Sequence, residues 1–248
     1  MCLEDERLDE VNDKIKLIQK IDGLTFGTDA LLLAAYIDGK YPTAIELGGG
    51  TGIISMLVST RGKAERIDCV EVQEEFSRLI SRNLALNRLD NKINSVYADA
   101  REFRPGFEYS MAFTNPPYMK TNSGKSNESL LKNIARHEVY GDISDFCRSA
   151  ARFIKYGGDF YVVYRPDRLT DLICAMRETR LEPKRMTFVC ADEKNSPSIV
   201  LIKAKRGGKS GMKLTRPLII YENSTHGEYG EDMKYIMEYG SFPKEFGI

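Results

Sequence analysis

The sequence predicts a single α/β domain with a mainly parallel β-sheet that has helices on both faces. From residue 43 onward, short apolar segments alternate with longer amphipathic ones, which is the pattern of repeated strand–helix–strand units. A glycine-rich turn at residues 48–52 follows the first apolar segment and leads directly into a helical one. The chain of 248 residues, 42% hydrophobic and 29% charged, is long enough for one large domain and shows no internal repeat or clear linker.

This alternation assigns the elements in chain order. Residues 1–24 alternate charged and apolar positions and end at the turn signal Asp22-Gly23. Thr28 is expected to cap a helix that runs to Tyr36, with Asp29 in its first turn. We then expect strands at 43–47, 66–71, 93–97, 110–114, 159–164, 186–190 and 198–203, helices at 53–60, 74–86, 129–139, 144–156, 167–179 and 228–239, and an apolar run at 217–221. The turn-rich link at 192–197 makes the last two strands an antiparallel hairpin at one edge of the sheet.

Composition and charge exclude several classes of protein. No apolar run approaches the roughly 18 residues needed to span a membrane, and the acidic N-terminus has no apolar signal core, so a cytoplasmic location is expected. Five scattered cysteines without a Cys-x-x-Cys pair predict reduced thiols and no metal site. With 36 basic and 36 acidic residues the chain has no net charge, so any contact with nucleic acid is expected to come from a local basic face.

The glycine-rich turn, Glu46-Leu47-Gly48-Gly49-Gly50-Thr51-Gly52, is a candidate binding loop. Gly48, Gly50 and Gly52 allow the backbone to turn tightly and to approach a ligand, although a strand-to-helix turn can need glycine for structural reasons alone. The Gly-x-Gly-x-Gly spacing differs from the Gly-x-Gly-x-x-Gly of dinucleotide-binding proteins, and no Gly-Lys-Ser/Thr follows the turn, which excludes a P-loop at this position.

Two carboxylates are expected at the same edge of the sheet as this turn. Glu71 ends the second strand and is placed to accept hydrogen bonds from a ribose diol. Asp99 follows the third strand and could hold the exocyclic amine of an adenine, with the Ala100 amide beside it. Each has a structural alternative, a solvated strand end for Glu71 and a helix cap for Asp99. Because the carboxyl ends of parallel strands meet at one edge, these groups and the glycine turn would line one crevice.

The fourth strand ends in Asn115-Pro116-Pro117-Tyr118, the most informative residues in the chain. The consecutive prolines stop the strand and stiffen the loop that follows. The Asn115 side-chain oxygen and the Pro116 carbonyl can each accept one N–H of a planar NH2 group, which would direct its lone pair toward an activated methyl group. Tyr118 offers a flat face on which a base could stack after it is turned out of its own stack. The structural alternative is a β-turn with a buried tyrosine.

The order of these motifs along the chain resembles that in the amino methyltransferases of the Rossmann-like class. The motifs are the turn at 46–52, Glu71, Asp99-Ala100 and Asn115-Pro116-Pro117-Tyr118. Two further segments narrow the resemblance to the bacterial tRNA1(Val) adenine-37 N6-methyltransferase family and its Gram-positive relatives; they are Phe26-Gly27-Thr28-Asp29-Ala30 upstream and Ile134-Ala135-Arg136-His137-Glu138 downstream. The resemblance covers about residues 15–221.

This resemblance implies a class I methyltransferase fold, in which a seven-stranded, mostly parallel sheet has an antiparallel last strand. It implies an RNA substrate, expected to be tRNA, in which N6 of an adenine is methylated. The catalytic residues would be Asn115, Pro116, Pro117 and Tyr118. It implies S-adenosylmethionine as cofactor, bound by Glu46, Gly48, Gly50, Gly52, Glu71, Asp99 and Ala100, with Thr28 and Asp29 over its methionine part. Residues 1–40 would be a helical segment that covers the cofactor, 41–204 the catalytic core, and 205–248 a basic loop and C-terminal extension.

Four other functions fit parts of the pattern. A protein glutamine N5-methyltransferase would use the same tetrapeptide, but that family carries a sizeable helical domain before the core, and only a short segment precedes Phe26. A DNA adenine methyltransferase would need a separate target-recognition domain. A non-catalytic RNA-binding module would not need an intact tetrapeptide, and a nicotinamide oxidoreductase is disfavoured by the glycine spacing.

Two further features bear on RNA binding and on proton transfer. Residues 203–213 are glycine-rich and predict a basic surface loop that contacts RNA, with a simply solvated loop as the alternative; the charges are Lys203, Lys205, Arg206, Lys209 and Lys213. His137 lies in an amphipathic helical segment and is interpreted as a packing or surface residue, because methylation of an amine needs no strong base.

Overall fold

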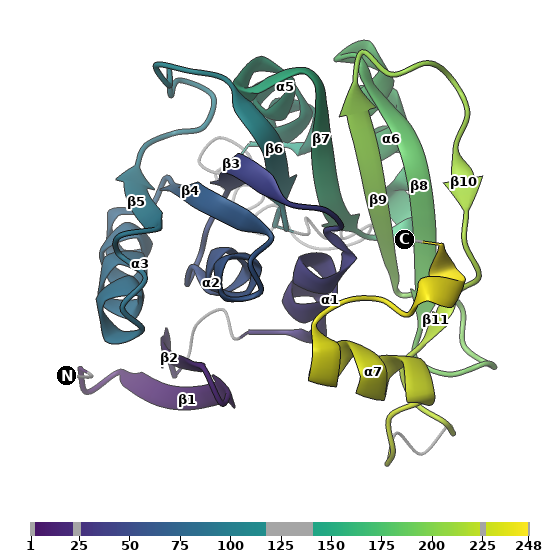
Figure 1. Ribbon diagram of the computed structural model, residues 1–248, viewed down its shortest axis with the longest axis horizontal. Coiled ribbons are helices and arrows are strands. Elements are labelled where there is room, and N and C mark those ends of the chain that lie inside the picture. Colours follow the sequence, from purple (N-terminus) through teal and green to yellow (C-terminus); the bar gives the residue numbers. More distant parts are fainter. Residues whose placement is uncertain (1–2, 22–25, 118–140, 224–226, 248) are drawn as a thin grey trace, which may run out of the picture.

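The computed structural model describes residues 3–21, 26–117, 141–223 and 227–247, which are built on a nine-stranded sheet (Figure 1). The strands of this sheet are β3 (Tyr41–Leu47), β4 (Ala64–Glu71), β5 (Ile93–Tyr97), β6 (Tyr109–Thr114), β7 (Ile154–Tyr164), β8 (Leu181–Cys190), β9 (Ile199–Arg206), β10 (Lys213–Leu214) and β11 (Leu218–Ile219). The helices are α1 (Thr28–Tyr36), α2 (Ile53–Thr60), α3 (Glu74–Leu86), α5 (Ile143–Phe153), α6 (Leu169–Glu178) and α7 (Glu231–Tyr239), with 3-10 turns η1 (Pro166–Arg168) and η2 (Lys244–Phe246).

The strand order is β10-β8-β9-β7-β6-β3-β4-β5, with β11 also on β8. Strands β3 to β7 pair in parallel, whereas β9 runs antiparallel to both β7 and β8. The chain therefore proceeds from β3 to β5 in one direction and crosses back to β6 on the other side of β3. This reversal makes the gap between β3 and β6 the switch point of the sheet, where α/β proteins bind ligands at the carboxyl ends of the strands.

The seven strands expected from the sequence are all present, but the expected total of seven is too low. The short strands β10 and β11 extend the sheet in parallel beyond β8. They supply hydrogen-bond partners to the outer edge of β8, which would otherwise expose unpaired backbone groups. The antiparallel strand β9 agrees with the reversed last strand that the sequence led us to expect.

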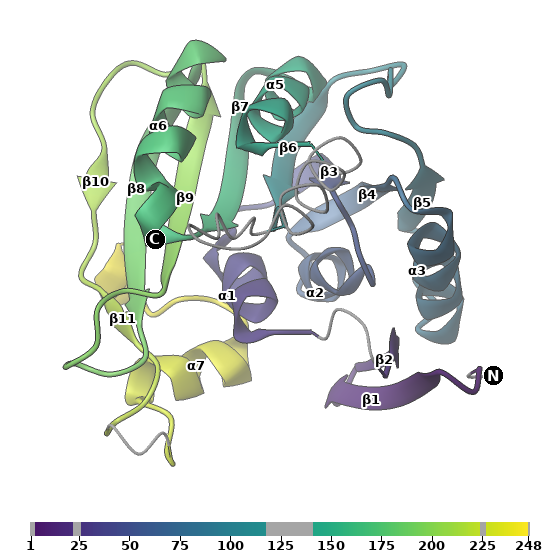
Figure 2. The ribbon, with the colours of Figure 1, turned by 180° about the vertical axis from the view of Figure 1, so that it is seen from behind.

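Helices cover both faces of the sheet (Figure 2). Helices α1, α2, α3 and α7 bury apolar side chains in one core, on the face opposite to that of α5 and α6. In the second core α5 contributes Phe146, Cys147 and Phe153, and α6 contributes Leu172 and Met176. The predicted architecture of a sheet between two helical layers is confirmed.

Three local expectations need correction. The expected Thr28 cap is wrong, because Gly27 occupies the N-cap position of α1 and offers no side-chain hydrogen bond. The helix expected at 144–156 ends at Phe153, since Ile154 already pairs with Tyr109 in the sheet. The N-terminal segment is not wholly helical, because β1 (Glu6–Asn12) and β2 (Ile15–Lys20) form an antiparallel hairpin. The helix expected at 129–139 lies outside the described residues.

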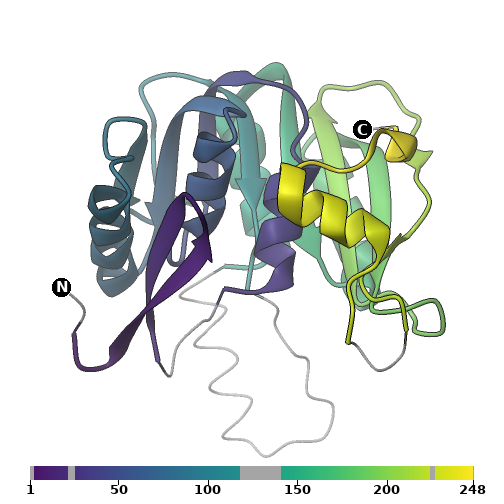
Figure 3. The same cartoon turned by 60° about the horizontal axis from the view of Figure 1, so that its bottom comes forward.

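The hairpin lies beside α2 and α3 (Figure 3), and side chains of α3 attach it to the domain. Asn83 accepts a hydrogen bond from Ile18 N at 2.8 Å and donates one back to Ile18 O at 3.0 Å, so its amide pairs with β2 as a neighbouring strand would. The same Nδ2 donates to Thr51 O at 3.0 Å. Asn83 is fully buried and therefore ties the hairpin, α3 and the glycine turn together.

We predict that Asn83→Ala lowers the free energy of unfolding by about 2–4 kcal/mol, because three buried backbone groups lose their partner at once. Urea unfolding followed by circular dichroism measures this change. The matched control is Asn94→Ala on β5, where the asparagine is exposed, and its expected effect is below about 0.5 kcal/mol. Equal effects of the two substitutions would show that the Asn83 amide does not hold the hairpin.

Candidate functional site

Four strand ends meet at the carboxyl edge of the sheet and bring together residues that are far apart in the sequence. Leu47 at the end of β3 pairs with Val70 of β4 and with Thr114 of β6. Glu71 pairs with Tyr97, the last residue of β5. The glycine turn, Glu71, Asp99 and Asn115 therefore follow neighbouring strands at one edge, as the sequence led us to expect.

The glycine turn is held against β4 by its own backbone. Gly48 N and Gly49 N both donate to Val70 O, at 2.9 and 3.0 Å, and Gly50 N donates to Glu71 Oε2 at 2.9 Å. Gly48 and Gly50 have φ angles of +73° and +55°, in the left-handed region that favours glycine. The turn thus needs these glycines for its shape, whatever it binds.

Gly49 is glycine for a different reason. A Cβ atom there would overlap Cys69 Sγ and lie 3.0 Å from Ile80 Cδ1. The space that a larger residue would need under the turn is already filled by these two side chains, from β4 and α3.

Glu46 lies beneath the turn and is only 1% exposed. Its Oε2 accepts hydrogen bonds from Ser55 N at 3.1 Å, from Ser55 Oγ and from Cys69 Sγ. Gly52 is the N-cap residue of α2 and has no side chain, so Glu46 supplies the capping carboxylate from the preceding strand. Glu46 Oε1 is buried without a hydrogen-bond partner among the described residues, and burial raises the pKa of this carboxyl to about 7.

Glu71 is 4% exposed and directs both carboxylate oxygens at backbone amides. Oε2 accepts from Gly50 N, and Oε1 accepts from Gln73 N at 2.9 Å. The carboxylate is thus fixed between the glycine turn and the start of α3. Each oxygen still has a lone pair with which it could accept a further hydrogen bond.

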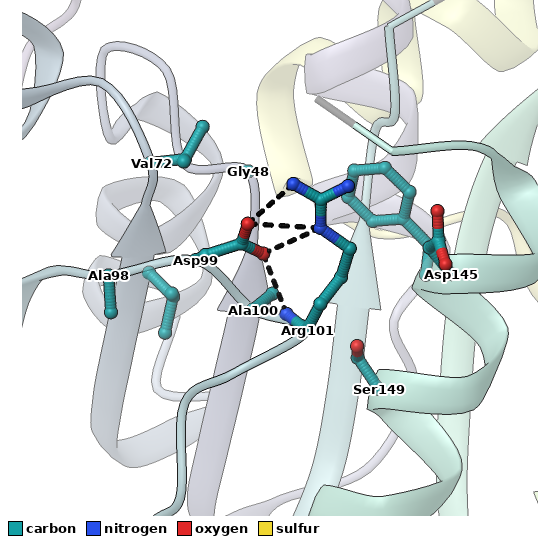
Figure 4. Close-up of a pocket in the computed structure, with 10 residues that line it drawn as sticks. Gly48, Val72, Ala98, Asp99, Ala100, Arg101, Asp145 and Ser149 are labelled. Atoms are coloured by element: carbon teal, nitrogen blue, oxygen red, sulfur yellow. Dashed lines mark hydrogen bonds and ion pairs between the residues drawn. The ribbon is translucent and has the colours of Figure 1, made fainter. Parts of the chain in front are cut away.

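Asp99 lines a small pocket between the strand ends and α5 (Figure 4). Its carboxylate accepts from Arg101 N at 2.8 Å and from the Arg101 guanidinium, whose Nε is 3.0 Å from each carboxylate oxygen. These hydrogen bonds lower the pKa of Asp99. The Arg101 side chain crosses the pocket, and the cavity volume that remains is about 30 Å³.

The opposite wall of this pocket was not expected from the sequence. Asp145, Phe146 and Ser149 of α5 line it together with Gly48 and Ala100. No local signal marked these three residues, because only the packing of α5 against the sheet brings them to the glycine turn. Arg101, by contrast, stands two residues after Asp99 and could have been noticed as its partner.

The corner after β6 lies next to the start of α1. Asn115 Nδ2 donates to Asp29 Oδ2 at 3.2 Å, while Pro116 is buried and Pro117 exposed. Thr114 Oγ1 donates to Leu47 O at 2.8 Å, which ties the corner to the end of β3. Tyr118 and the segment 134–138, with His137, lie outside the described residues.

The expected basic loop at 203–213 is corrected in part. Lys203, Lys205 and Arg206 belong to β9 rather than to a loop. Their side chains form ion pairs with Asp38 (2.7 Å), Asp159 (2.7 Å) and Glu108 (3.2 Å), respectively. The pairing of β9 with β7 and β8 brings Lys203 and Lys205 to carboxylates that are largely buried, so the charges of these two lysines are largely neutralised within the fold. The partner of Arg206, Glu108, is exposed, so this ion pair is open to solvent.

Three further properties concern the described residues alone. In this part of the chain, no group of histidine, cysteine and carboxylate side chains could hold a metal ion. None of its helices is both long and apolar enough to cross a membrane. Cys69, Cys147, Cys174 and Cys190 are free thiols.

Comparison with known proteins identifies relatives of this chain. A family model described as the methyltransferase small domain matches residues 21–170. The chain is 29% identical over 180 residues to the tRNA1(Val) (adenine(37)-N6)-methyltransferase of Phocaeicola vulgatus, across 72% of this chain and 76% of that protein.

Solved structures share the fold. A predicted O-methyltransferase from Agrobacterium tumefaciens superposes with a TM-score of 0.69 at 21% identity, over 87% of this chain and 98% of that one. Geranyl diphosphate C-methyltransferase from Streptomyces coelicolor A3(2), in complex with S-adenosyl-L-homocysteine, gives a TM-score of 0.54 at 16% identity, over 71% and 78% of the two chains. These likenesses confirm the Rossmann-like architecture predicted from the sequence.

The buried Glu46 predicts a pH dependence of stability. Its pKa is raised from 4.5 to about 7 in the folded chain, so between these values the folded state binds more protons than the unfolded state. Stability from this group is therefore fully present below pH 4.5 and is lost as the pH rises to about 7. The expected loss is on the order of 3 kcal/mol.

Urea unfolding of the wild type and of Glu46→Gln between pH 4.5 and 7 tests this expectation. The glutamine resembles the neutral acid, so the variant should lose less stability across this range than the wild type does. Glu65→Gln, at an exposed position on β4, is the matched control and should keep the slope of the wild type. An unchanged slope in Glu46→Gln would assign the pH dependence to another group.

Proposed function

The chain belongs to the methyltransferase small domain family, and its cofactor is S-adenosylmethionine. We propose that it methylates N6 of an adenine in tRNA. The relative from Phocaeicola vulgatus, named for methylation of adenine 37 in tRNA1(Val), supports this choice of acceptor. Such a substrate would place the enzyme in the cytoplasm. The observation that carries the proposal is the position of Asn115-Pro116-Pro117 at the switch point, one strand away from the glycine turn.

The residues at this edge fit S-adenosylmethionine. An added Cβ at Gly50 would meet no atom of the described residues within 4 Å, and this leaves room for a ligand against the backbone there. Glu71 would accept hydrogen bonds from the ribose hydroxyls. Asp99 would accept one from the adenine amine once Arg101 gives up a hydrogen bond. Glu46 would act from below, by holding the turn and α2 in place.

The bound cofactor supplies an electrophilic methyl group on a sulfonium. What this chain must add is orientation of a weak nucleophile, because the lone pair of an aromatic amine is delocalised into its ring. Asn115 Oδ1 and Pro116 O would each accept one N–H of that amine and so aim the lone pair at the methyl group. Both oxygens also stabilise the positive charge that develops on nitrogen, and the surplus proton leaves afterwards to solvent.

Asp29 has a positioning role in this scheme. Its carboxylate accepts from Asn115 Nδ2, which sets the amide so that Oδ1 remains the acceptor for the substrate. Its negative charge also lies close to the place where positive charge develops. Thr28 and Asp29 were expected to cover the methionine part of the cofactor, and the contact with Asn115 adds a second reason for an acidic residue at the start of α1.

We predict that the purified chain converts adenosine to N6-methyladenosine in tRNA from cells that lack it. Mass spectrometry of the nucleosides after incubation with S-adenosylmethionine identifies the product. Asn115→Ala should lower the rate by about 100-fold or more, because one of two oriented acceptors is lost, while cofactor affinity changes by only several-fold. Asn94→Ala, at an exposed position on β5, is the matched control.

Three outcomes would count against this function. Methylation at another position of the base would contradict the N6 assignment. Methylglutamine in a protein substrate, with no modified nucleoside, would favour the amide methyltransferase. Full activity of Asn115→Ala would remove the role given to the corner after β6.

A further inference from the structure

An open groove on the α5–α6 side of the sheet gathers four arginines from three separate segments. Arg148 and Arg152 come from α5, Arg180 follows α6, and Arg206 ends β9. Tyr156, at the start of β7, completes what we call the arginine face. We propose that the arginine face binds the phosphate backbone of the RNA substrate and that Tyr156 stacks on one of its bases. This inference rests on the proposed function, because it names where that substrate lies.

The charge of the arginine face is unusual for this protein. Of the residues that the structure describes, four arginines and no acidic residue line the groove, although the whole chain has 36 basic and 36 acidic residues. Arg148 and Arg206 each have one acidic partner, Asp145 and Glu108. In the described part of the chain, neither Arg152 nor Arg180 forms an ion pair with a carboxylate. Positive charge is therefore concentrated here, and a polyanion would neutralise it.

Two arginines of this face are held in fixed positions. Arg152 Nη2 donates to Ala100 O at 2.7 Å, and its guanidinium lies 4.8 Å from the centre of the Phe153 ring. Arg206 Nη1 donates to Ile154 O. A guanidinium that is already oriented loses less conformational entropy on binding a phosphate than a mobile one does. Its remaining N–H groups can donate to two phosphate oxygens at once.

Tyr156 gives this face its second feature. It is 73% exposed, which is a large exposure for an aromatic side chain, and Tyr156 OH donates to Gly207 O at 3.2 Å. The ring lies over Gly207, where any Cβ would overlap it. A fixed, exposed aromatic ring among arginines is the combination that binds single-stranded nucleic acid through base stacking and backbone contacts.

Two other grooves on the described surface suit a phosphate backbone less well. The groove beside Pro116 and Pro117 carries three carboxylates and one arginine; these are Asp142, Asp171, Glu178 and Arg168. The groove between the hairpin and α3 has three acidic and three basic side chains; these are Glu6, Glu74, Glu75, Lys20, Arg78 and Arg82. Charge thus favours the arginine face over both.

The arginine face is connected to the candidate active site through α5. Asp145, Phe146 and Ser149 of this helix line the pocket at Asp99, whereas Arg148 and Arg152 line the arginine face. At roughly 1.5 Å per residue, the five to nine residues between Ile143 and these arginines span about 7–14 Å. Tyr156, Arg180 and Arg206 lie further away, near the start of β7 and β8 and the end of β9, so RNA on the arginine face would run along α5 to reach the corner after β6.

The test compares Arg152→Gln/Arg180→Gln with the control Arg66→Gln/Arg78→Gln, which removes two exposed arginines from β4 and α3. Filter binding of bulk tRNA at several KCl concentrations gives the affinity and its salt dependence. The first double variant should bind about tenfold or more weakly, with a salt slope that is smaller by about 1 to 2. Arg152 contacts Ala100, a candidate cofactor-binding residue, whereas Arg180 lies away from it. Arg180→Gln alone should therefore show part of the same loss of tRNA binding. Calorimetric titration with S-adenosylmethionine confirms that each variant is folded.

Tyr156→Ala separates stacking from charge. It should weaken tRNA binding by about tenfold while leaving the salt slope unchanged, because no phosphate contact is lost. Tyr239→Ala, at an exposed tyrosine on α7, is its matched control.

The outcomes distinguish this inference from the function on which it rests. If the wild type binds and methylates tRNA and both double variants bind it equally well, the arginine face is not the RNA site and the proposed function stands. If the wild type neither binds nor methylates tRNA, the proposed function fails and this inference with it. If polyglutamate competes as well as tRNA for the wild type, the face binds acidic protein instead, which also overturns the inference.

Discussion

The glycine turn after β3 must stay in one place, and two buried polar side chains hold it there. Glu46 caps α2 from below the turn. Asn83 is fully buried and forms hydrogen bonds both to the hairpin and to Thr51 O. Neither group could be replaced by an apolar one without leaving buried backbone amides or carbonyls unpaired, which costs more than the hydrogen bonds themselves contribute. The position of the glycine turn relative to α2, α3 and the hairpin depends on that pair.

The same constraint connects the N-terminal hairpin with the candidate active site. Gln19 of β2 accepts from Phe26 N at 2.9 Å, which fixes the chain just before α1. Helix α1 then places Asp29 against Asn115. The hairpin of β1 and β2, which is separate from the main sheet, is thus connected to the Asn115 amide at the switch point. The connection consists of hydrogen bonds to Gln19 and Asp29 and does not pass through the sheet. Residues before α1 are therefore linked to the acceptor geometry after β6 by two hydrogen bonds and the start of α1.

The sequence predicted the strands and the residues that follow them, because strand ends carry local signals. Glycines with positive φ and consecutive prolines act through their own backbones, so Gly48, Gly50 and Pro116 could be recognised without knowledge of the fold. The hairpin was missed because β2 is stabilised by side chains of α3, about 65 residues further along the chain. Asp145 and Phe146 were missed for the same physical reason: their neighbours at the pocket come from other elements.

Charge shows this limit most clearly. Lys203, Lys205 and Arg206 are close in sequence, yet they pair with Asp38, Asp159 and Glu108. Among the described residues, the groove arginines that lack such partners are Arg152 of α5 and Arg180, two residues after α6, and no short window of sequence contains both. The field around a folded chain depends on which charges remain after internal pairing, and pairing is decided by tertiary contacts. A chain with no net charge can therefore present a strongly basic face, provided that its acidic residues are engaged elsewhere, as the carboxylates around β9 are here.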